Sequence, residues 1–160
     1  MAEVETVLLA NHAEAVNGLL YLAGGGWTHH WRGVPQPGQP MPPSTVAFAS
    51  TITAPATEPP AAIPFTVRIT GADGAEVMRA EGTLSLGAGD SVSTKRAAFA
   101  GNFGIAFPAD GRYELTVEIP GSRRSVEFWV HDQPMPPPGQ GPQSGQAQHG
   151  GRSDPTPGYI

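Results

Sequence analysis

The sequence contains no cysteine, few charged residues and no long hydrophobic run. The lack of cysteine excludes a disulfide framework, a thiolate metal site and a cysteine nucleophile. No stretch approaches the roughly 20 apolar residues that span a bilayer. The first residues include acids where a secretory signal has a basic region. We therefore expect a cytoplasmic protein with no membrane partner.

Positive charge is also scarce. Lys and Arg number 9 against 14 Asp and Glu, and the formal net charge is −5. The adjacent basic residues are Lys95-Arg96 and Arg123-Arg124, and each pair reads as a loop or hairpin tip. Because nucleic acids are bound chiefly through clustered Lys and Arg, we expect no nucleic-acid partner.

Alternation of apolar and polar residues dominates the chain. It is clearest in "FTVRITG", "RYELTVEI" and "SVEFWVH", where every second residue is apolar. In the last of these, Phe128 and Val130 are expected inside, with Trp129 and His131 outside. About eight such strands, separated by turn residues, predict an all-β fold: an antiparallel β-sandwich of the immunoglobulin-like or fibronectin-like kind.

Two turns carry specific signals. Asp73-Gly74 lies between two alternating segments and predicts a hairpin. Tyr113 follows a turn at the start of an alternating strand, as in a tyrosine corner, where the phenol bonds to upstream backbone.

Proline-rich segments divide the chain. Residues 34–43 and 54–64 are expected to be extended loops between strands. Residues 1–133 are expected to form the β-sandwich domain, and residues 134–160 a disordered tail rich in Pro, Gly and Gln. This tail regains bulky residues only at Tyr159 and Ile160, a candidate anchor for a groove on another protein.

The segment "LAGGGWTHHWRG", residues 22–33, gathers unusual residues. Strand alternation places Trp27, His29 and Trp31 in one row on one face. In one interpretation the glycines bend the strand and the tryptophans cover an end of the sandwich. In the other, the row and the outward Trp129 form an exposed aromatic patch that binds a partner or a small ligand.

The segment "LLANHAEAVNGLLYLAGGGWT" resembles the start of a family of small uncharacterised bacterial proteins, frequent in actinobacteria. These open with an L-x-D-x-A segment followed by a G-K-L-Y-x-L-G-G-G-W strand, which match Leu9–Ala13 and Gly18–Trp27. The resemblance covers roughly residues 5–131 and implies a β-sandwich in a bacterial host, with no established activity. Asn11 stands where many family members have an acid, and Leu19 where they often have Lys, so a carboxylate or acid–base role at the first of these positions does not carry over to this chain from the resemblance.

Catalytic motifs are absent from the sequence. There is no G-x-S-x-G elbow, phosphate loop or dinucleotide fingerprint. His29 and His30 are expected on opposite faces of a strand, so a shared metal would require His12 or His131. We expect no cofactor and no metal.

The residues therefore favour a non-catalytic β-sandwich module that acts through protein–protein contacts or self-association, with a flexible C-terminal arm. The alternative is a small-ligand or metal-binding domain, or a hydrolase without a known motif, centred on Trp27, His29 and Trp31.

Overall fold

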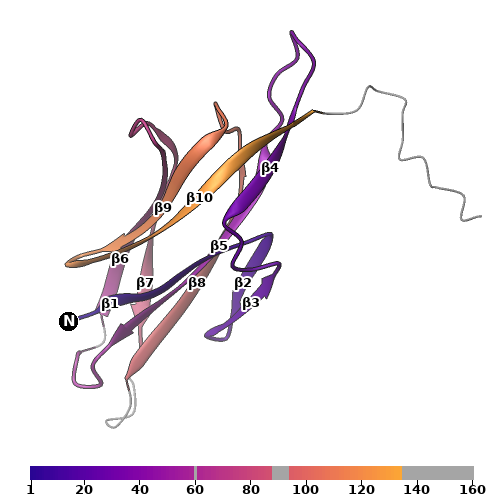
Figure 1. The fold of residues 1–160 in the computed structure, drawn as a ribbon. Helices are drawn as coiled ribbons and strands as arrows, with labels where there is room; N and C mark the ends of the chain where they lie inside the picture. Colours follow the sequence, from indigo (N-terminus) through magenta and orange to yellow (C-terminus); the bar gives the residue numbers. More distant parts are fainter. Residues whose placement is uncertain (60, 88–93, 135–160) are drawn as a thin grey trace, which may run out of the picture.

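The computed structural model describes residues 1–59, 61–87 and 94–134, and these form ten strands and no helix (Figure 1). No described segment is a helix able to cross a membrane. The all-β prediction is confirmed. The strands are β1 Glu3–Ala10, β2 His12–Val16, β3 Leu19–Ala23, β4 His29–Val34, β5 Ser44–Ala54, β6 Ala61–Gly71, β7 Glu76–Leu86, β8 Lys95–Ile105, β9 Gly111–Ile119 and β10 Ser122–Pro134.

The strands form three sheets. Their orders are β1-β5-β8, β4-β10-β9-β6-β7, and the hairpin β2-β3. The two larger sheets bury one common core, to which both contribute alternate residues, including Phe48 of β5, Leu115 of β9 and Phe128 of β10. As alternation predicts, Phe128 and Val130 are buried.

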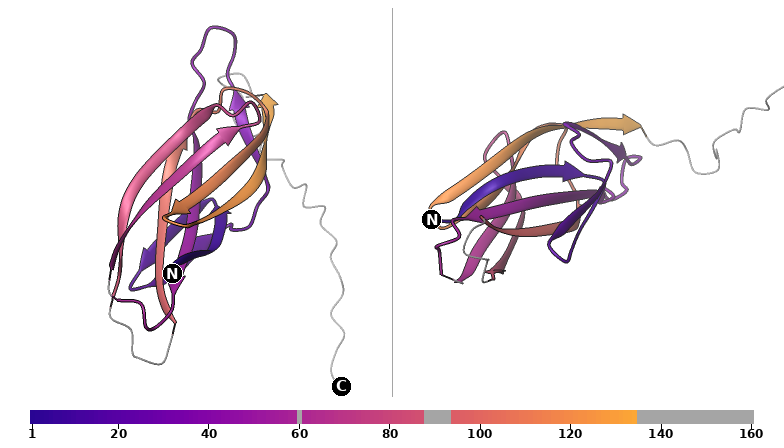
Figure 2. Two further views of the ribbon diagram at one scale, coloured as in Figure 1. Left: turned by 90° about the vertical axis from the view of Figure 1, so that its left-hand side faces the viewer. Right: turned by 90° about the horizontal axis from the view of Figure 1, so that it is seen from below.

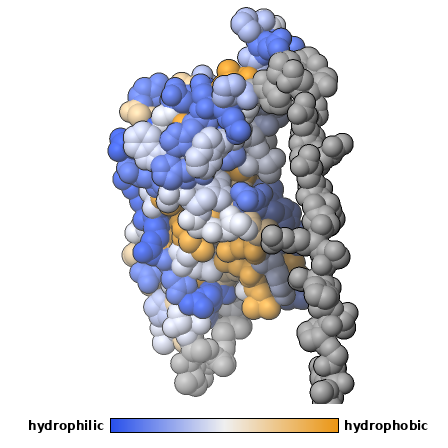
Figure 3. Space-filling model, turned by 45° about the vertical axis from the view of Figure 1, so that its right-hand side comes forward, coloured by the Kyte–Doolittle hydropathy of each residue, from blue (hydrophilic) through white to orange (hydrophobic). Residues whose placement is uncertain are grey.

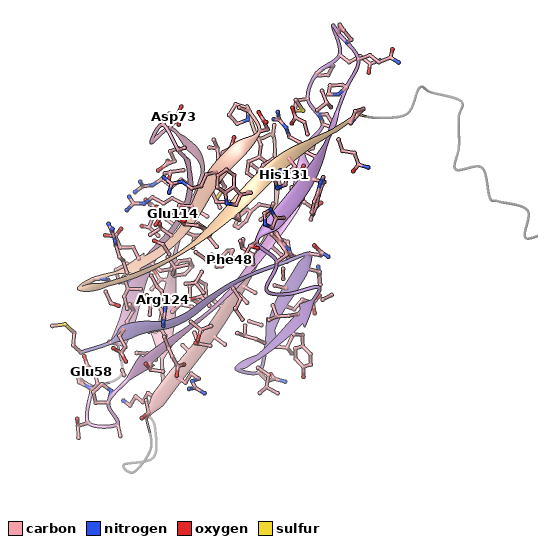
Figure 4. The ribbon with its side chains drawn as sticks, in the orientation of Figure 1. Phe48, Glu58, Asp73, Glu114, Arg124 and His131 are labelled. Carbon is pink, nitrogen blue, oxygen red and sulfur yellow. The ribbon has the colours of Figure 1, made fainter. Side chains whose placement is uncertain are left out.

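The two larger sheets approach each other at their edges, so that the strands curl around the core (Figure 2). β1 lies beside β10, where the Val4 backbone N–H donates to the Ser122 hydroxyl at 3.0 Å. The guanidinium of Arg124, which also lies on β10 (Figure 4), donates to the Glu5 carbonyl. These bonds fix β10, and hence its neighbour β4, relative to the smaller sheet.

Both turn predictions are confirmed. Asp73 and Gly74 connect β6 to β7, and the Asp73 carboxylate accepts from the Ala75 N–H at 3.0 Å. The Tyr113 hydroxyl donates to the Ala109 carbonyl at 2.8 Å, which is the bond of a tyrosine corner.

The structure has ten strands among the described residues, more than the eight or so that the sequence predicts. The prediction of about eight strands omitted β2, because the first alternating segment breaks at Asn11 and resumes as the hairpin β2-β3. Asn17 and Gly18 both have positive φ in its two-residue turn, at 52° and 77°, as a type I′ turn requires. The prediction also did not count β4, which pairs with β10.

The first proline-rich loop is confirmed, since β4 ends at Val34 and β5 begins at Ser44 (Figure 1). The second is shorter than predicted, because β6 already begins at Ala61. Pro64 fits within β6 because it pairs with β7 before the pairing with β9 starts at Thr66. The predicted disordered tail and its anchor, Tyr159 and Ile160, lie outside the described residues, apart from Pro134 at the end of β10.

Candidate functional site

Parallel pairing of β4 with β10 brings together the unusual residues of two distant segments. Trp129 pairs with His29, and His131 pairs with Trp31. Because paired residues of neighbouring strands lie on the same face of a sheet, all four side chains share the outer face. We call these four residues the aromatic surface. His131 lies where β10 runs beside β4 (Figure 4).

Both tryptophans of the aromatic surface are exposed, and the rings of His29, Trp31 and His131 lie close together. Trp31 is 59% exposed and Trp129 46%. Nδ1 of His29 and Nε2 of His131 are 2.7 Å apart, so one nitrogen donates a hydrogen bond and the other accepts it. The two imidazoles stack with centroids 5.0 Å apart, and the Trp31 ring lies 5.3 Å from that of His131. The outward prediction for Trp129 is confirmed.

The predicted row of Trp27, His29 and Trp31 is wrong in one member. Trp27 is half-buried against the core, edge-on to Phe128 with a centroid distance of 5.6 Å. The alternation does not hold there because β4 begins only at His29, and the preceding backbone turns at Gly24 and Gly26, whose φ angles are 59° and 80°. Trp27 therefore packs with His30 on the inner side, with centroids 5.4 Å apart.

An open hollow of about 570 Å³ lies beside the aromatic surface. It is lined by Asn11, the glycines 24–26, Trp27, His30 and the two outward residues of β4. Trp27 Nε1 and His30 Nε2 are both buried and have no hydrogen-bond partner among the described residues. Desolvation by burial lowers the pKa of His30, so this ring is held neutral more firmly than an exposed histidine.

Asn11 shapes one wall of the hollow. A Cβ at Gly24 would meet the Asn11 amide nitrogen at 2.4 Å, so glycine is required there for contact as well as for its positive φ. The Asn11 N–H donates to the Ala23 carbonyl at 3.0 Å and the Gly26 N–H to the Leu9 carbonyl at 2.7 Å. The "GGG" segment thus folds against the end of β1, which supports its interpretation as architecture.

Arg32 is a residue of this region that the sequence analysis missed. Its side chain is 5% exposed; its Nε donates to the Asp132 carboxylate at 2.6 Å and its Nη1 to the Phe107 carbonyl. Its position could have indicated its burial, because Arg32 lies two residues after His30 and therefore on the same inward face of β4. This ion pair, between a buried Arg32 and an exposed Asp132, joins the end of β4 to the end of β10.

The histidines do not assemble a metal site in the described residues. His131 meets His29, as a shared site would need, but His12 instead contacts its neighbour Glu14 at 3.0 Å. Among residues 1–59, 61–87 and 94–134, no group of three or more His, Cys, Asp or Glu is arranged to hold a metal ion.

A second exposed apolar area lies on the β2-β3 hairpin. Its large exposed residues are Val16, Leu19, Tyr21 and Leu22, of which Leu19 is 60% exposed. In Figure 3, apolar atoms gather on the lower part of the face shown, on the side where Figure 1 places this hairpin. Of these residues, only Leu19 stood out in the sequence, as a departure from the family pattern.

Comparisons with known proteins identify a family. A search of curated proteins finds no match. One similar solved structure is the Pseudomonas fluorescens alkylpurine DNA glycosylase AlkC bound to DNA containing an abasic site analog, with 16% identity and a TM-score of 0.44. The match covers 78% of this chain and only 30% of that one. The profile of a family of unknown function, DUF6941, matches residues 5–129. The chain therefore belongs to the DUF6941 family.

Proposed function

We propose that this protein is a non-catalytic, immunoglobulin-like β-sandwich module that acts through protein contacts, and that its aromatic surface is a self-association site. The observation that carries the proposal is the exposure of Trp31 and Trp129 on neighbouring strands, at 59% and 46%. Tryptophan is among the residues that contribute most to binding energy at protein interfaces. Exposed aromatic rings that gather on one face of a sheet indicate a binding surface rather than a part of the domain's own core.

The position of the surface in the sheet supports the same proposal. β4 is the edge strand of its sheet among the described residues, with β10 on one side only. An edge strand presents unpaired backbone groups, and soluble proteins commonly protect such edges with lysine or proline. β4 reads "HHWRGV", and its one cation, Arg32, is buried rather than placed on the outer face. The unprotected edge of β4 and the aromatic surface beside it together favour a two-fold symmetric contact with a second copy of the protein.

The test is sedimentation velocity on the full chain over a concentration series. We expect wild type to self-associate and the double variant Trp31→Ala/Trp129→Ala to associate at least about 10-fold more weakly, because each lost tryptophan removes a hot-spot contact. Leu19→Ala is the matched control, since Leu19 is as exposed as Trp31 but lies on the β2-β3 hairpin. If Leu19→Ala abolishes association and the tryptophan variant still associates, the interface lies on the β2-β3 hairpin instead.

A second candidate function is supported by the hollow. Two buried polar atoms without partners, Trp27 Nε1 and His30 Nε2, are a donor and a titratable nitrogen that a small polar ligand would satisfy. Tryptophan fluorescence of the purified protein against a metabolite pool, with elemental analysis, tests this candidate. A ligand in the hollow would change the emission of wild type, and the change would be smaller in Trp27→Phe, where Trp31 is the remaining indole that lines the hollow.

A further inference from the structure

The segment that follows β10 repeats a sequence found inside the fold. "QPMPP" occurs at Gln39–Pro43 and again at Gln133–Pro137, where another proline, Pro138, extends it. The first copy packs on this protein, with Met41 and Pro42 half-buried before β5 begins. The second copy starts at the end of β10, where Pro134 is exposed and pairs with Val34.

We propose that the second copy, Pro134–Pro138, of one chain binds the aromatic surface of a second copy of the protein. This inference rests on the proposed self-association and names the segment that makes the contact. Proline-rich segments adopt the polyproline II helix, and surfaces of exposed aromatic rings recognise that helix. Indole N–H groups donate only, and the helix presents solvated carbonyls as acceptors.

The repeat of the proline-rich segment is similar to the spacing of the two exposed tryptophans. Residues i and i+3 of a polyproline II helix lie on the same side, about 9 Å apart. Pro134 and Pro137 have this spacing, as do Met135 and Pro138. Trp31 and Trp129 lie on adjacent strands two residues out of register, which separates their Cα atoms by about 8 Å. One turn of the helix therefore matches the separation of the two tryptophan Cα atoms.

The direction of β10 favours a second copy, rather than the same chain, as the source of the segment. Pro134 continues β10 three residues beyond His131, whose partner is Trp31. To cover Trp31 and Trp129, the chain would have to reverse direction within Gln133–Pro138, which has prolines at four positions and no glycine. Consecutive prolines hold a segment extended. A reciprocal exchange between two copies, each giving its segment to the other, meets this constraint.

Full-length variants test the inference by sedimentation velocity. Pro136→Ser/Pro137→Ser/Pro138→Ser is expected to weaken self-association at least about 10-fold. The matched control, Pro142→Ser/Pro155→Ser/Pro157→Ser, removes as many prolines from the same tail and is expected to associate like wild type. Equal loss in both variants would overturn the specific role of Pro134–Pro138.

A mixing experiment tests whether the proline-rich segment of one chain binds the aromatic surface of another. The proline variant has an intact aromatic surface, and Trp31→Ala/Trp129→Ala has an intact segment, so their mixture is expected to form a complex at concentrations where neither associates alone. No complex in the mixture would overturn the exchange between copies. Weakening by the tryptophan variant without weakening by the proline variant would overturn this inference and leave the proposed interface standing. Wild type that stays monomeric throughout would overturn both.

Discussion

At the scale of single residues, aromatic rings of the core dictate where glycine must stand. A Cβ at Gly101 would lie 2.6 Å from Phe48 Cε1 and 2.9 Å from Phe103 Cε2, whose rings stack with centroids 5.8 Å apart. Gly101→Ala is therefore expected to lower the free energy of unfolding by about 1–3 kcal/mol, the usual cost of overpacking. Urea denaturation of wild type and Gly101→Ala measures this loss in the free energy of unfolding.

The control for this substitution lies on the same strand. Gly104 is also in β8, but its added Cβ would meet only Pro43 at 3.5 Å, an ordinary contact. Gly104→Ala is expected to leave stability unchanged or slightly raised, because alanine restricts the unfolded chain. Equal losses for the two variants would mean that the Phe48 and Phe103 rings do not set the requirement.

His30 gives the fold a dependence on pH. Burial lowers its pKa in the folded state, so the unfolded chain takes up a proton first as the pH falls below about 6.5. Stability is then lost with falling pH, because the unfolded state binds more protons than the folded state. Urea denaturation at about pH 7.5 and about pH 5 is expected to show a smaller loss for His30→Phe than for wild type. The same loss in His30→Phe and in wild type would assign the effect to other groups.

At the scale of elements, a single side chain holds the β2-β3 hairpin on the smaller sheet. The Asn102 amide accepts from the Ala13 N–H at 3.1 Å and donates to the Ala13 carbonyl at 2.7 Å. Asn102→Ala leaves both groups of the buried Ala13 without this partner, so we expect a loss of about 1–3 kcal/mol. Hydrogen exchange of the amides in β2 and β3 should accelerate before that of the core.

A second variant separates the two bonds. Asn102→Asp keeps the acceptor for the Ala13 N–H but faces the Ala13 carbonyl with a second acceptor in place of the donor, so its exchange rates should rise above those of wild type. Unchanged exchange in residues 12–23 of Asn102→Ala would show that the hairpin is held by its apolar contacts instead.

The sequence predicted elements wherever alternation was unbroken. The segments that became β6, β9 and β10 have a clear period of two, and their inward residues are buried or half-buried against the core. The prediction failed near Asn11 and Gly24–Gly26, where the backbone turns and the period is lost. Local patterns cannot show such changes of direction, because hydrogen bonds to distant backbone, such as Gly26 to Leu9, determine them.

The candidate site was predictable in part for the same reason. Alternation placed Trp129 and His131 outward, because both lie within one regular strand. It could not show that β4 would pair parallel with β10 and bring His29 to His131, since the two segments are far apart in the sequence. The ion pair of Arg32 and Asp132 depends on that same long-range pairing.

At the scale of the whole molecule, the central claim is that a second copy covers Trp31 and Trp129. A Trp27→Phe background isolates these two indoles, because the chain has three tryptophans. The substitution should be tolerated: phenylalanine retains a ring against Phe128, and the lost Nε1 has no hydrogen-bond partner among the described residues.

The most direct measurement is the tryptophan emission of Trp27→Phe over a concentration series, compared with its sedimentation. We predict that the emission shifts to shorter wavelength as the protein associates, with both curves sharing one midpoint, because the interface removes water from the exposed indoles. An emission that stays constant while the protein associates would contradict the claim, and so would a chain that stays monomeric across the series.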